Sequence, residues 1–235
     1  MTGKHDGPAT AHTRDGPYGK DDVAVETMTT WSLVVPVKPL DRAKSRLAAA
    51  TGAHREKFAL AIAADTITAA MASPAVRQVI VVTDDLVAGG VLGELGAYVI
   101  ADGPDAGLNP ALRHGAAAAA RLAPRAGIAA LFADLPALRP GELTRALDAA
   151  RPWRQAFVPD AAEEGTTLYT ALPADGFAPA FGRGSRDRHR LRGAHELRPR
   201  DIPGLRRDVD TLADLREAIT LGLGPHTTEV AALFV

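Results

Sequence analysis

The stretch Ser32-Leu-Val-Val-Pro-Val37 is a short apolar run that leads straight into a basic loop, and its pattern indicates the fold class. Similar runs recur along the chain, separated by Ala- and Leu-rich segments of helical length. Because these runs are continuous rather than alternating, both faces of each strand must be covered, as in a mostly parallel sheet with helices on both sides. We therefore predict an α/β, three-layer, Rossmann-like fold. The expected strands are 32–37, 78–83, 97–101, 128–132, 156–158 and 166–172, and the expected helices are 55–71, 86–95, 110–122, 141–150 and 211–221.

Composition excludes several classes of protein. The chain has 235 residues, of which 46% are hydrophobic, with a net charge of −1 and no cysteine. These values argue against bulk disorder, a strongly basic nucleic-acid binder, disulfides, iron–sulfur clusters and a cysteine nucleophile. No apolar run approaches the ~20 residues of a membrane span, and the N-terminus lacks the apolar core of a signal peptide. We expect a cytoplasmic protein without a membrane partner.

The chain divides into a short extension and one domain. Residues 1–28 mix Gly, Pro, Asp, Lys, Thr and His without periodicity, which predicts a disordered extension. A translation start at Met28 is the alternative interpretation. Residues 29–235 are long enough for a single domain with a sizeable core. After Asp160 the regular alternation of strand and helix gives way to a less regular region, expected on the substrate side.

The first strand is followed by a basic segment from Lys38 to Arg46, which includes Lys44. Open α/β sheets bind ligands beyond the carboxyl ends of their strands, and backbone amides and cationic side chains placed there can hold a polyphosphate. The segment is not a Walker A loop, and no Gly-x-Gly-x-x-Gly fingerprint follows any strand. A solvated basic helix is the competing interpretation.

Three carboxylates are candidates for a metal site. Asp134 follows an apolar strand, and Asp208 and Asp210 stand two residues apart, so an extended backbone turns both toward one face. Such oxygen ligands suit magnesium, which neutralises phosphate charge during nucleotidyl transfer. The alternative is that Asp210, or Thr211 with Asp214, caps the helix that follows.

The segment 183–207 contains nine Arg and three acidic residues, a surplus of six positive charges. It begins within Phe181-Gly-Arg-Gly-Ser185, whose small residues beside a helix start resemble an anion cradle. An RNA-binding arm is the competing interpretation, but no aromatic residue interleaves the arginines to stack on bases.

Other catalytic patterns are missing. The seven His show no metal-ligand spacing, and there is no Gly-x-Ser-x-Gly elbow. Asn109, before Pro110, is interpreted first as a helix cap and second as a ligand contact.

Taken together, the motifs closely resemble the guanylyltransferases of deazaflavin coenzyme (F-four-twenty) biosynthesis. The resemblance covers the chain from Trp31 to about Gly224 and departs from the usual pattern at Ala133, where the family has Gly. The matching motifs are Val-Pro-Val-Lys38 through Arg46-Leu, Leu108-Asn109-Pro-Ala-Leu, Asp134-Leu-Pro136, Gly165-Thr166, Phe181-Gly182-x-x-Ser185 and Asp208-Val-Asp210-Thr.

The resemblance implies a nucleotide-diphospho-sugar transferase (GT-A-like) fold and the transfer of GMP from GTP to phosphoenolpyruvate, with release of pyrophosphate. Residues 29–235 would be the nucleotidyltransferase domain, and the product would pass to the next enzyme of the pathway. By the family's pattern, two magnesium ions would be held by Asp134, Asp208 and Asp210, the acceptor by Thr166, Gly182 and Ser185, and the nucleotide by Lys38, Lys44, Arg46, Thr83 and Asn109, with Lys38, Arg46 and Asp134 acting in catalysis.

Alternatives remain open at this stage. The acceptor could be 2-phospho-L-lactate or 3-phosphoglycerate, and guanine selection is assigned only to the loops after Thr83 and Asp102. Molybdenum-cofactor guanylyltransferases share the fold, but their Gly-rich N-terminal loop is absent. A non-catalytic phosphate- or RNA-binding protein is the rival from another class.

Overall fold

A computed structural model describes residues 30–234 and shows a seven-stranded sheet. The strand order is β3-β2-β1-β4-β6-β5-β7; β6 runs antiparallel to β4 and β5, and every other pairing is parallel. The strands are β1 (Trp31–Pro36), β2 (Val76–Val82), β3 (Tyr98–Ile100), β4 (Gly127–Leu131), β5 (Gln155–Pro159), β6 (Thr166–Ala171) and β7 (His195–Glu196). The prediction of a mostly parallel α/β sheet is therefore confirmed. The predicted extension 1–28 and the alternative start at Met28 lie outside the described residues.

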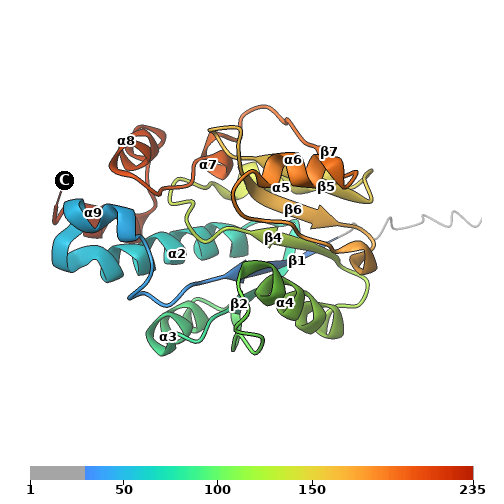
Figure 1. The fold of residues 1–235 in the computed structure, drawn as a ribbon, viewed down its shortest axis with the longest axis horizontal. Helices are drawn as coiled ribbons and strands as arrows, with labels where there is room; N and C mark the ends of the chain where they lie inside the picture. The colour runs from blue at the N-terminus through green and yellow to red at the C-terminus, as the bar shows by residue number, and fades with distance from the viewer. Residues whose placement is uncertain (1–29, 235) are drawn as a thin grey trace, which may run out of the picture.

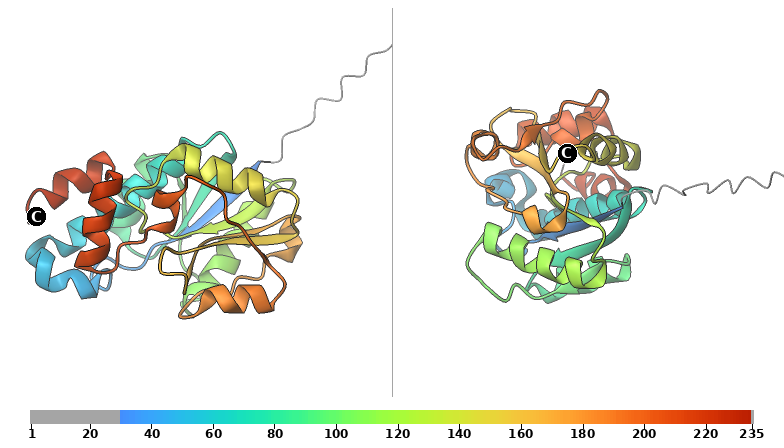
Figure 2. Two further views of the ribbon diagram at one scale, coloured as in Figure 1. Left: turned by 90° about the horizontal axis from the view of Figure 1, so that it is seen from above. Right: turned by 90° about the vertical axis from the view of Figure 1, so that its right-hand side faces the viewer.

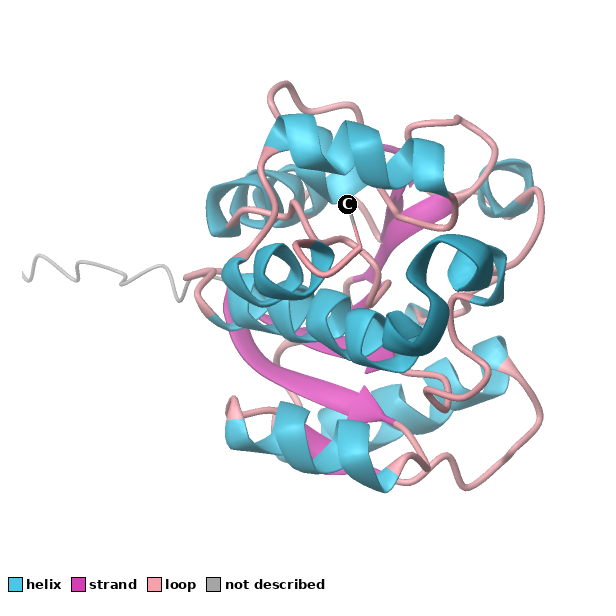
Figure 3. Ribbon diagram, turned by 90° about the vertical axis from the view of Figure 1, so that its left-hand side faces the viewer, coloured by secondary structure: helices cyan, strands magenta, loops and turns pink. Residues whose placement is uncertain are grey.

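Helices cover both faces of this sheet, as the continuous apolar runs predicted (Figure 1, Figure 3). The five expected helices and six expected strands begin and end within two residues of their predicted bounds. The helices are α1 (Ala48–Thr51), α2 (Arg55–Met71), α3 (Leu86–Glu94), α4 (Leu108–Leu122), α5 (Pro140–Ala150), α6 (Ser185–Leu191), α7 (Pro203–Arg206), α8 (Leu212–Leu221) and α9 (Pro225–Ala231), with 3-10 turns at Ser45–Leu47, Gly52–His54 and Ala174–Gly176. None of the helices within 30–234 is long and apolar enough to cross a membrane.

Strand β1 shows how the two faces are divided. Leu33 and Val35 pack into the core formed with α2, α3 and α5, whereas Val34 packs with α4 on the opposite face. All three side chains are fully buried. Gly115 in α4 allows the close approach, because a Cβ there would lie 2.4 Å from a Val34 methyl group.

The C-terminal helices close one end of the molecule, where α8 and α9 lie beside α1 and the start of α2 (Figure 2). Asp65 of α2 fixes this arrangement, since its buried carboxylate accepts hydrogen bonds from the backbone N–H groups of His226 (3.1 Å) and Thr227 (2.7 Å). These hydrogen bonds tie the start of α9 to α2. The segment that leads into α8 lies at the carboxyl end of β4, where the candidate site is found.

Candidate active site

A cavity of about 440 Å³ opens at the carboxyl ends of β1 and β4. The predicted basic loop and the predicted carboxylates line it together, although they come from segments far apart in the sequence. Its charged lining residues are Lys38, Arg42, Lys44, Arg46, Asp134, Asp208 and Asp210. The expectation that positive loops and carboxylates meet at the strand ends thus holds for these residues.

A backbone contact brings the carboxylates together. The N–H of Val209 donates to the carbonyl of Asp134 at 3.1 Å, which joins the 208–210 segment to the chain just beyond β4. Val209 is fully buried, while Asp208 and Asp210 on either side of it both line the cavity. The predicted two-residue alternation therefore applies here.

The N-terminus of α8 shows which residues cap this helix. Thr211 is the N-cap residue, and its hydroxyl accepts from the N–H of Asp214 while the Asp214 carboxylate accepts from the N–H of Thr211. This capping box needs no contribution from the Asp210 side chain. Asp210 is consequently left to face the cavity.

Lys44 stands between two of the carboxylates. Its Nζ lies 2.8 Å from Asp134 and 3.0 Å from Asp210, and the side chain is 10% exposed. Burial alone would lower the pKa of Lys44, but the two carboxylates outweigh it and raise the pKa, so the ammonium stays charged. The backbone at Lys44 is left-handed, with φ of 52°, and this turn directs the chain across the cavity.

The negative charge is unevenly compensated. Burial, followed by the charge of Asp134 and then of Asp160 and Asp210, raises the pKa of Asp208 to about 7. Burial acts the same way on Asp210, but Lys44, with Arg46 and Lys38 further away, holds its pKa below the ordinary value. The Asp208 side of the cavity therefore lacks a compensating cation.

The donor set suits a divalent cation. Oδ1 of Asp134 is buried and has no hydrogen-bond partner among the described residues, although Oδ2 is paired with Lys44. Within 30–234, no three His, Cys or acidic side chains already stand in a closed metal-ligand cluster. Lys44 lies between Asp134 and Asp210 and pairs with both. Carboxylate oxygens, one of them unpartnered, together with a displaceable ammonium, fit magnesium chemically.

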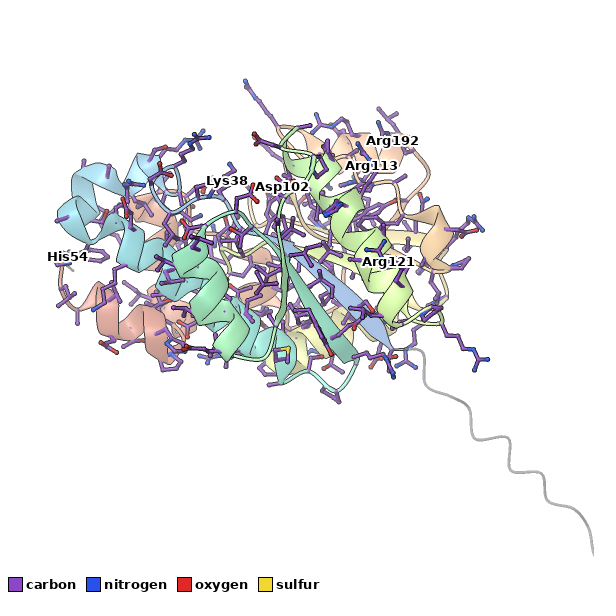
Figure 4. All side chains as sticks on the ribbon, turned by 90° about the horizontal axis from the view of Figure 1, so that it is seen from below. Lys38, His54, Asp102, Arg113, Arg121 and Arg192 are labelled. Carbon is purple, nitrogen blue, oxygen red and sulfur yellow. The ribbon has the colours of Figure 1, made fainter. Side chains whose placement is uncertain are left out.

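A second cavity lies beyond the aromatic pair Phe132 and Phe181, whose ring centroids are 5.0 Å apart. It measures about 530 Å³ and is lined by Gly182 of the predicted acceptor set. Thr166 and Ser185 are buried and line neither of these two cavities. Four arginines line the second cavity. Figure 4 shows two of them, Arg113 and Arg192, near each other, with Arg121 further along α4. The four that line the cavity are Arg113, Arg183, Arg188 and Arg192.

Two predicted nucleotide contacts have other partners. Asn109 lies inside α4, where Gly107 is the N-cap, so the cap interpretation is wrong. Its amide instead donates to the carbonyl of Phe181 at 3.0 Å and accepts from the N–H of Phe181 at 2.8 Å. Thr83 is buried, and its hydroxyl accepts from the N–H of Asp85 at 3.2 Å.

Much of the arginine-rich segment is neutralised by ion pairs. Glu196 accepts from three of its arginines, and Glu163, from outside the segment, pairs with three as well. Asp214 and Glu217 of α8 pair with Arg207. The net surplus counted from the sequence therefore overstates the field at the surface. The arginines paired with carboxylates are Arg186, Arg190, Arg198, Arg206 and Arg207.

The chain is similar to known proteins over most of its length. Residues 31–231 match the family model described as guanylyl transferase CofC like. The chain belongs to this family. It is 57% identical to phosphoenolpyruvate guanylyltransferase from Thermomonospora curvata over 214 residues (89% of this chain, 94% of the relative) and 57% identical to the enzyme of that name from Streptomyces coelicolor over 203 residues (86% and 96%).

The fold agrees with this membership. A crystal structure assigned as a nucleotide-diphospho-sugar transferase from Desulfovibrio desulfuricans G20 superimposes with a TM-score of 0.59 and 17% identity, covering 83% of this chain and 97% of that one. The guanylyl transferase chain thus has the fold implied by its sequence motifs.

Two features of this CofC-like chain were missed from the sequence. Lys44 was assigned to phosphate binding alone, and its place between carboxylates 90 and 166 positions away leaves no local signal. The spacing of His189 matches no ligand motif, yet the residue is fully buried and hydrogen-bonds to Thr166 of the predicted acceptor set. The only available hint was its place one helical turn after Ser185.

Proposed function

We propose that this chain transfers GMP from GTP to phosphoenolpyruvate, giving enolpyruvyl-diphospho-guanosine and pyrophosphate. The observation that carries the proposal is the single cavity in which a basic loop meets Asp134, Asp208 and Asp210. Relatives at 57% identity named for this reaction support the choice of GTP and of the acceptor. Residues 29–235 would work as one nucleotidyltransferase domain in the cytoplasm.

The basic loop is proposed to hold the GTP phosphates. Lys38, Lys44 and Arg46 line the cavity and place positive charge beside the carboxylates. Cationic side chains form strong, charge-assisted hydrogen bonds with phosphate oxygens. The Arg46 side chain is 75% exposed and forms only a long ion pair with Asp210, at 3.9 Å, so its guanidinium could turn toward a bound triphosphate. Thr83 and Asn109 would contribute by shaping the nucleotide side of the cavity, since their side chains are already engaged.

Asp134, Asp208 and Asp210 are proposed to hold magnesium, up to two ions. Bound there, magnesium would neutralise charge on the phosphates and orient the reacting groups. Lys44 would then exchange its carboxylate partners for phosphate oxygens. The unpartnered Oδ1 of Asp134 and the crowding of negative charge around Asp208 support this assignment.

The reaction proposed is an in-line displacement at the α-phosphorus of GTP. A phosphate oxygen of the acceptor forms the new P–O bond as the bond to the bridging oxygen of pyrophosphate breaks. The attacking phosphate is already ionised near neutral pH, so no general base is needed, and none of the residues of 30–234 that line the first cavity is a His. The protein contributes by holding two polyanions in line and screening their repulsion.

The acceptor is proposed to bind at Thr166, Gly182 and Ser185. Because Thr166 and Ser185 are buried, they would contribute at the buried end of the acceptor site, through backbone groups or hydroxyls. The labile product would be handed to the next enzyme of the pathway.

The test is pyrophosphate release by the purified full chain with GTP and magnesium. Phosphoenolpyruvate, 2-phospho-L-lactate and 3-phosphoglycerate are supplied separately, with ATP replacing GTP as the nucleotide control. Release with GTP and phosphoenolpyruvate alone is the expected result. Release with another acid corrects the acceptor. No release from folded protein contradicts the proposal, and magnesium-independent, steeply salt-dependent RNA binding would then favour the binding-protein alternative.

A further inference from the structure

His189 is a fully buried histidine that the proposed chemistry does not use. It lies in α6, and its ring is enclosed by aromatic side chains from three other segments. The ring stacks on Tyr169 of β6 with centroids 4.6 Å apart, and it also contacts Phe157 of β5 at 5.5 Å and Phe181 at 5.2 Å. A buried polar ring in such a setting needs hydrogen-bond partners, and His189 has one for each nitrogen.

The partner of Nε2 identifies the tautomer. The backbone N–H of Ala180 donates to Nε2 at 2.9 Å, and a backbone N–H can only donate. Nε2 is therefore the unprotonated nitrogen, and in a neutral ring the proton is on Nδ1. Desolvation, with smaller contributions from the charges of Arg188 and Arg192, lowers the pKa of His189 to about 4, which keeps the ring neutral near pH 7.

The second bond then has a defined direction. Nδ1–H donates to the hydroxyl oxygen of Thr166, 3.0 Å away. Because that oxygen accepts from His189, the hydroxyl proton of Thr166 must point elsewhere, and no described residue accepts it. The hydroxyl is consequently left as a donor, the role in which it can meet an anionic ligand.

The two hydrogen bonds of His189 also connect segments that contribute residues to the predicted acceptor site. Thr166 begins β6, Ala180 lies two residues before Gly182, and Ser185 lies one helical turn before His189. Among residues 30–234, no hydrogen bond joins Thr166 directly to Gly182 or Ser185. The imidazole links Thr166 to the loop by hydrogen bonds, beside the ring contact between Tyr169 of β6 and Phe181.

We infer that His189 is a positioning residue for the acceptor acid: as the Nδ1–H tautomer it sets the distance between β6 and the 180–185 loop and orients the Thr166 hydroxyl as a donor. This inference rests on the proposed function, since it takes the acceptor to bind at Thr166, Gly182 and Ser185. His189 touches neither GTP nor the reacting atoms in this scheme, so it should affect acceptor binding rather than the chemical step or the nucleotide.

Two amide substitutions separate the two bonds. In His189→Asn the shorter amide can reach the Nδ1 position and donate to Thr166, but it falls short of Ala180. In His189→Gln the longer amide can reach the Nε2 position and accept from Ala180, but it does not reproduce the donor to Thr166. His189→Phe keeps the aromatic packing and removes both bonds. His195 is the matched control, because its ring stacks on Trp153 away from both cavities.

The experiment is steady-state kinetics of pyrophosphate release, varying GTP and phosphoenolpyruvate separately, on protein whose folded fraction is checked by circular dichroism. Loss of one hydrogen bond predicts a rise of about tenfold in the KM for phosphoenolpyruvate in His189→Asn and in His189→Gln, with more in His189→Phe. The KM for GTP and the kcat of folded protein should stay within about threefold, as should all constants of His195→Asn, because neither hydrogen bond is changed there.

A double-mutant cycle distinguishes the proposed positioning role of His189 from a merely structural effect of its substitution. In a Thr166→Val background, His189→Gln should no longer raise the KM for phosphoenolpyruvate, because the donor it removes has lost its partner. An unchanged KM for phosphoenolpyruvate in the single variants, or an equal rise in both KM values, overturns the inference.

If wild-type protein releases no pyrophosphate with any acceptor, it is the proposed function that fails. In that case ¹⁵N NMR of histidine-labelled protein still tests the inference, with the His189→Gln spectrum identifying the signal: protonation at Nε2 contradicts it, and protonation at Nδ1 supports it.

Discussion

Two charged regions of this molecule differ in how completely their charged side chains are paired. In the first cavity, Asp134, Asp208 and Asp210 crowd together, the Lys44 ammonium pairs with only two of them, and one buried oxygen of Asp134 has no partner among the described residues. In the arginine-rich segment, Glu163 and Glu196 are each surrounded by guanidinium groups that satisfy them. Charge that is crowded and only partly compensated is costly to bury and indicates a ligand site, whereas charge that is fully paired indicates structure. Substitutions in the first region should therefore affect turnover, and those in the second should affect stability.

The largest expected effect is that of Asp208→Asn. Removing a proposed metal ligand should lower pyrophosphate release by about 1000-fold or more, since charge neutralisation at the phosphates is the main catalytic contribution proposed. The melting temperature should not fall, because the amide relieves the crowding that raises the pKa of Asp208 to about 7. Asp187→Asn, at an exposed carboxylate in the arginine-rich segment, is the control and should leave turnover unchanged. Turnover of Asp208→Asn within tenfold of wild type would contradict the metal assignment.

Removing the metal from wild-type protein should be nearly as damaging to activity but harmless to the fold. Chelation should abolish pyrophosphate release and added magnesium should restore it, while the melting temperature measured in chelator stays unchanged. The reason is that Lys44 already pairs with both Asp134 and Asp210 and compensates part of their charge without a metal. In Lys44→Met that compensation is gone, so magnesium should raise the melting temperature of this variant more than that of wild type. Strong destabilisation of wild type by the chelator would contradict this role of Lys44.

The same contrast explains what could be predicted from the sequence. Strand ends and the Asp208 and Asp210 alternation follow from local patterns, and Val209 turns inward between them as expected. The position of Lys44 depends on contacts with residues 90 and 166 positions away, and hydrophobic periodicity says nothing about such pairs. The sequence overstates the positive charge of the arginine-rich segment for the same reason, because Glu163 and Glu217, which lie outside the segment, pair with its arginines. The preference of Asn for helix caps predicts a cap at Asn109, but in the structure its amide hydrogen-bonds to the backbone of Phe181.

Acid should destabilise the protein through His189. Its pKa of about 4 in the folded chain lies below the ordinary 6.5, so between these values the unfolded chain binds more protons. The free energy of unfolding from this group is fully present above pH 6.5 and falls by about 3 kcal/mol as the pH drops toward 4. Urea unfolding of wild type and His189→Phe at pH 7 and pH 4.5 isolates the effect. The carboxylates are common to both proteins, so their contribution cancels in the difference between the two free energies of unfolding. A difference that does not change with pH would contradict the prediction.

The smallest expected effect tests whether the paired region is purely structural. Burial alone would raise the pKa of Glu196, but hydrogen bonds from Arg186, Arg190 and Arg198 hold it at about 2. Its side chain is 13% exposed, so in Glu196→Gln the three guanidinium groups lose a partly buried counter-charge, and unfolding should become easier by about 2 kcal/mol. Glu217→Gln, at an exposed ion pair with Arg207, should cost no more than about 0.5 kcal/mol. Both variants should keep the turnover of folded protein. If Glu196→Gln instead lowered turnover without lowering the free energy of unfolding, the segment would belong to the reaction rather than to the scaffold, and the distinction between crowded and paired charge would not separate function from structure in this chain.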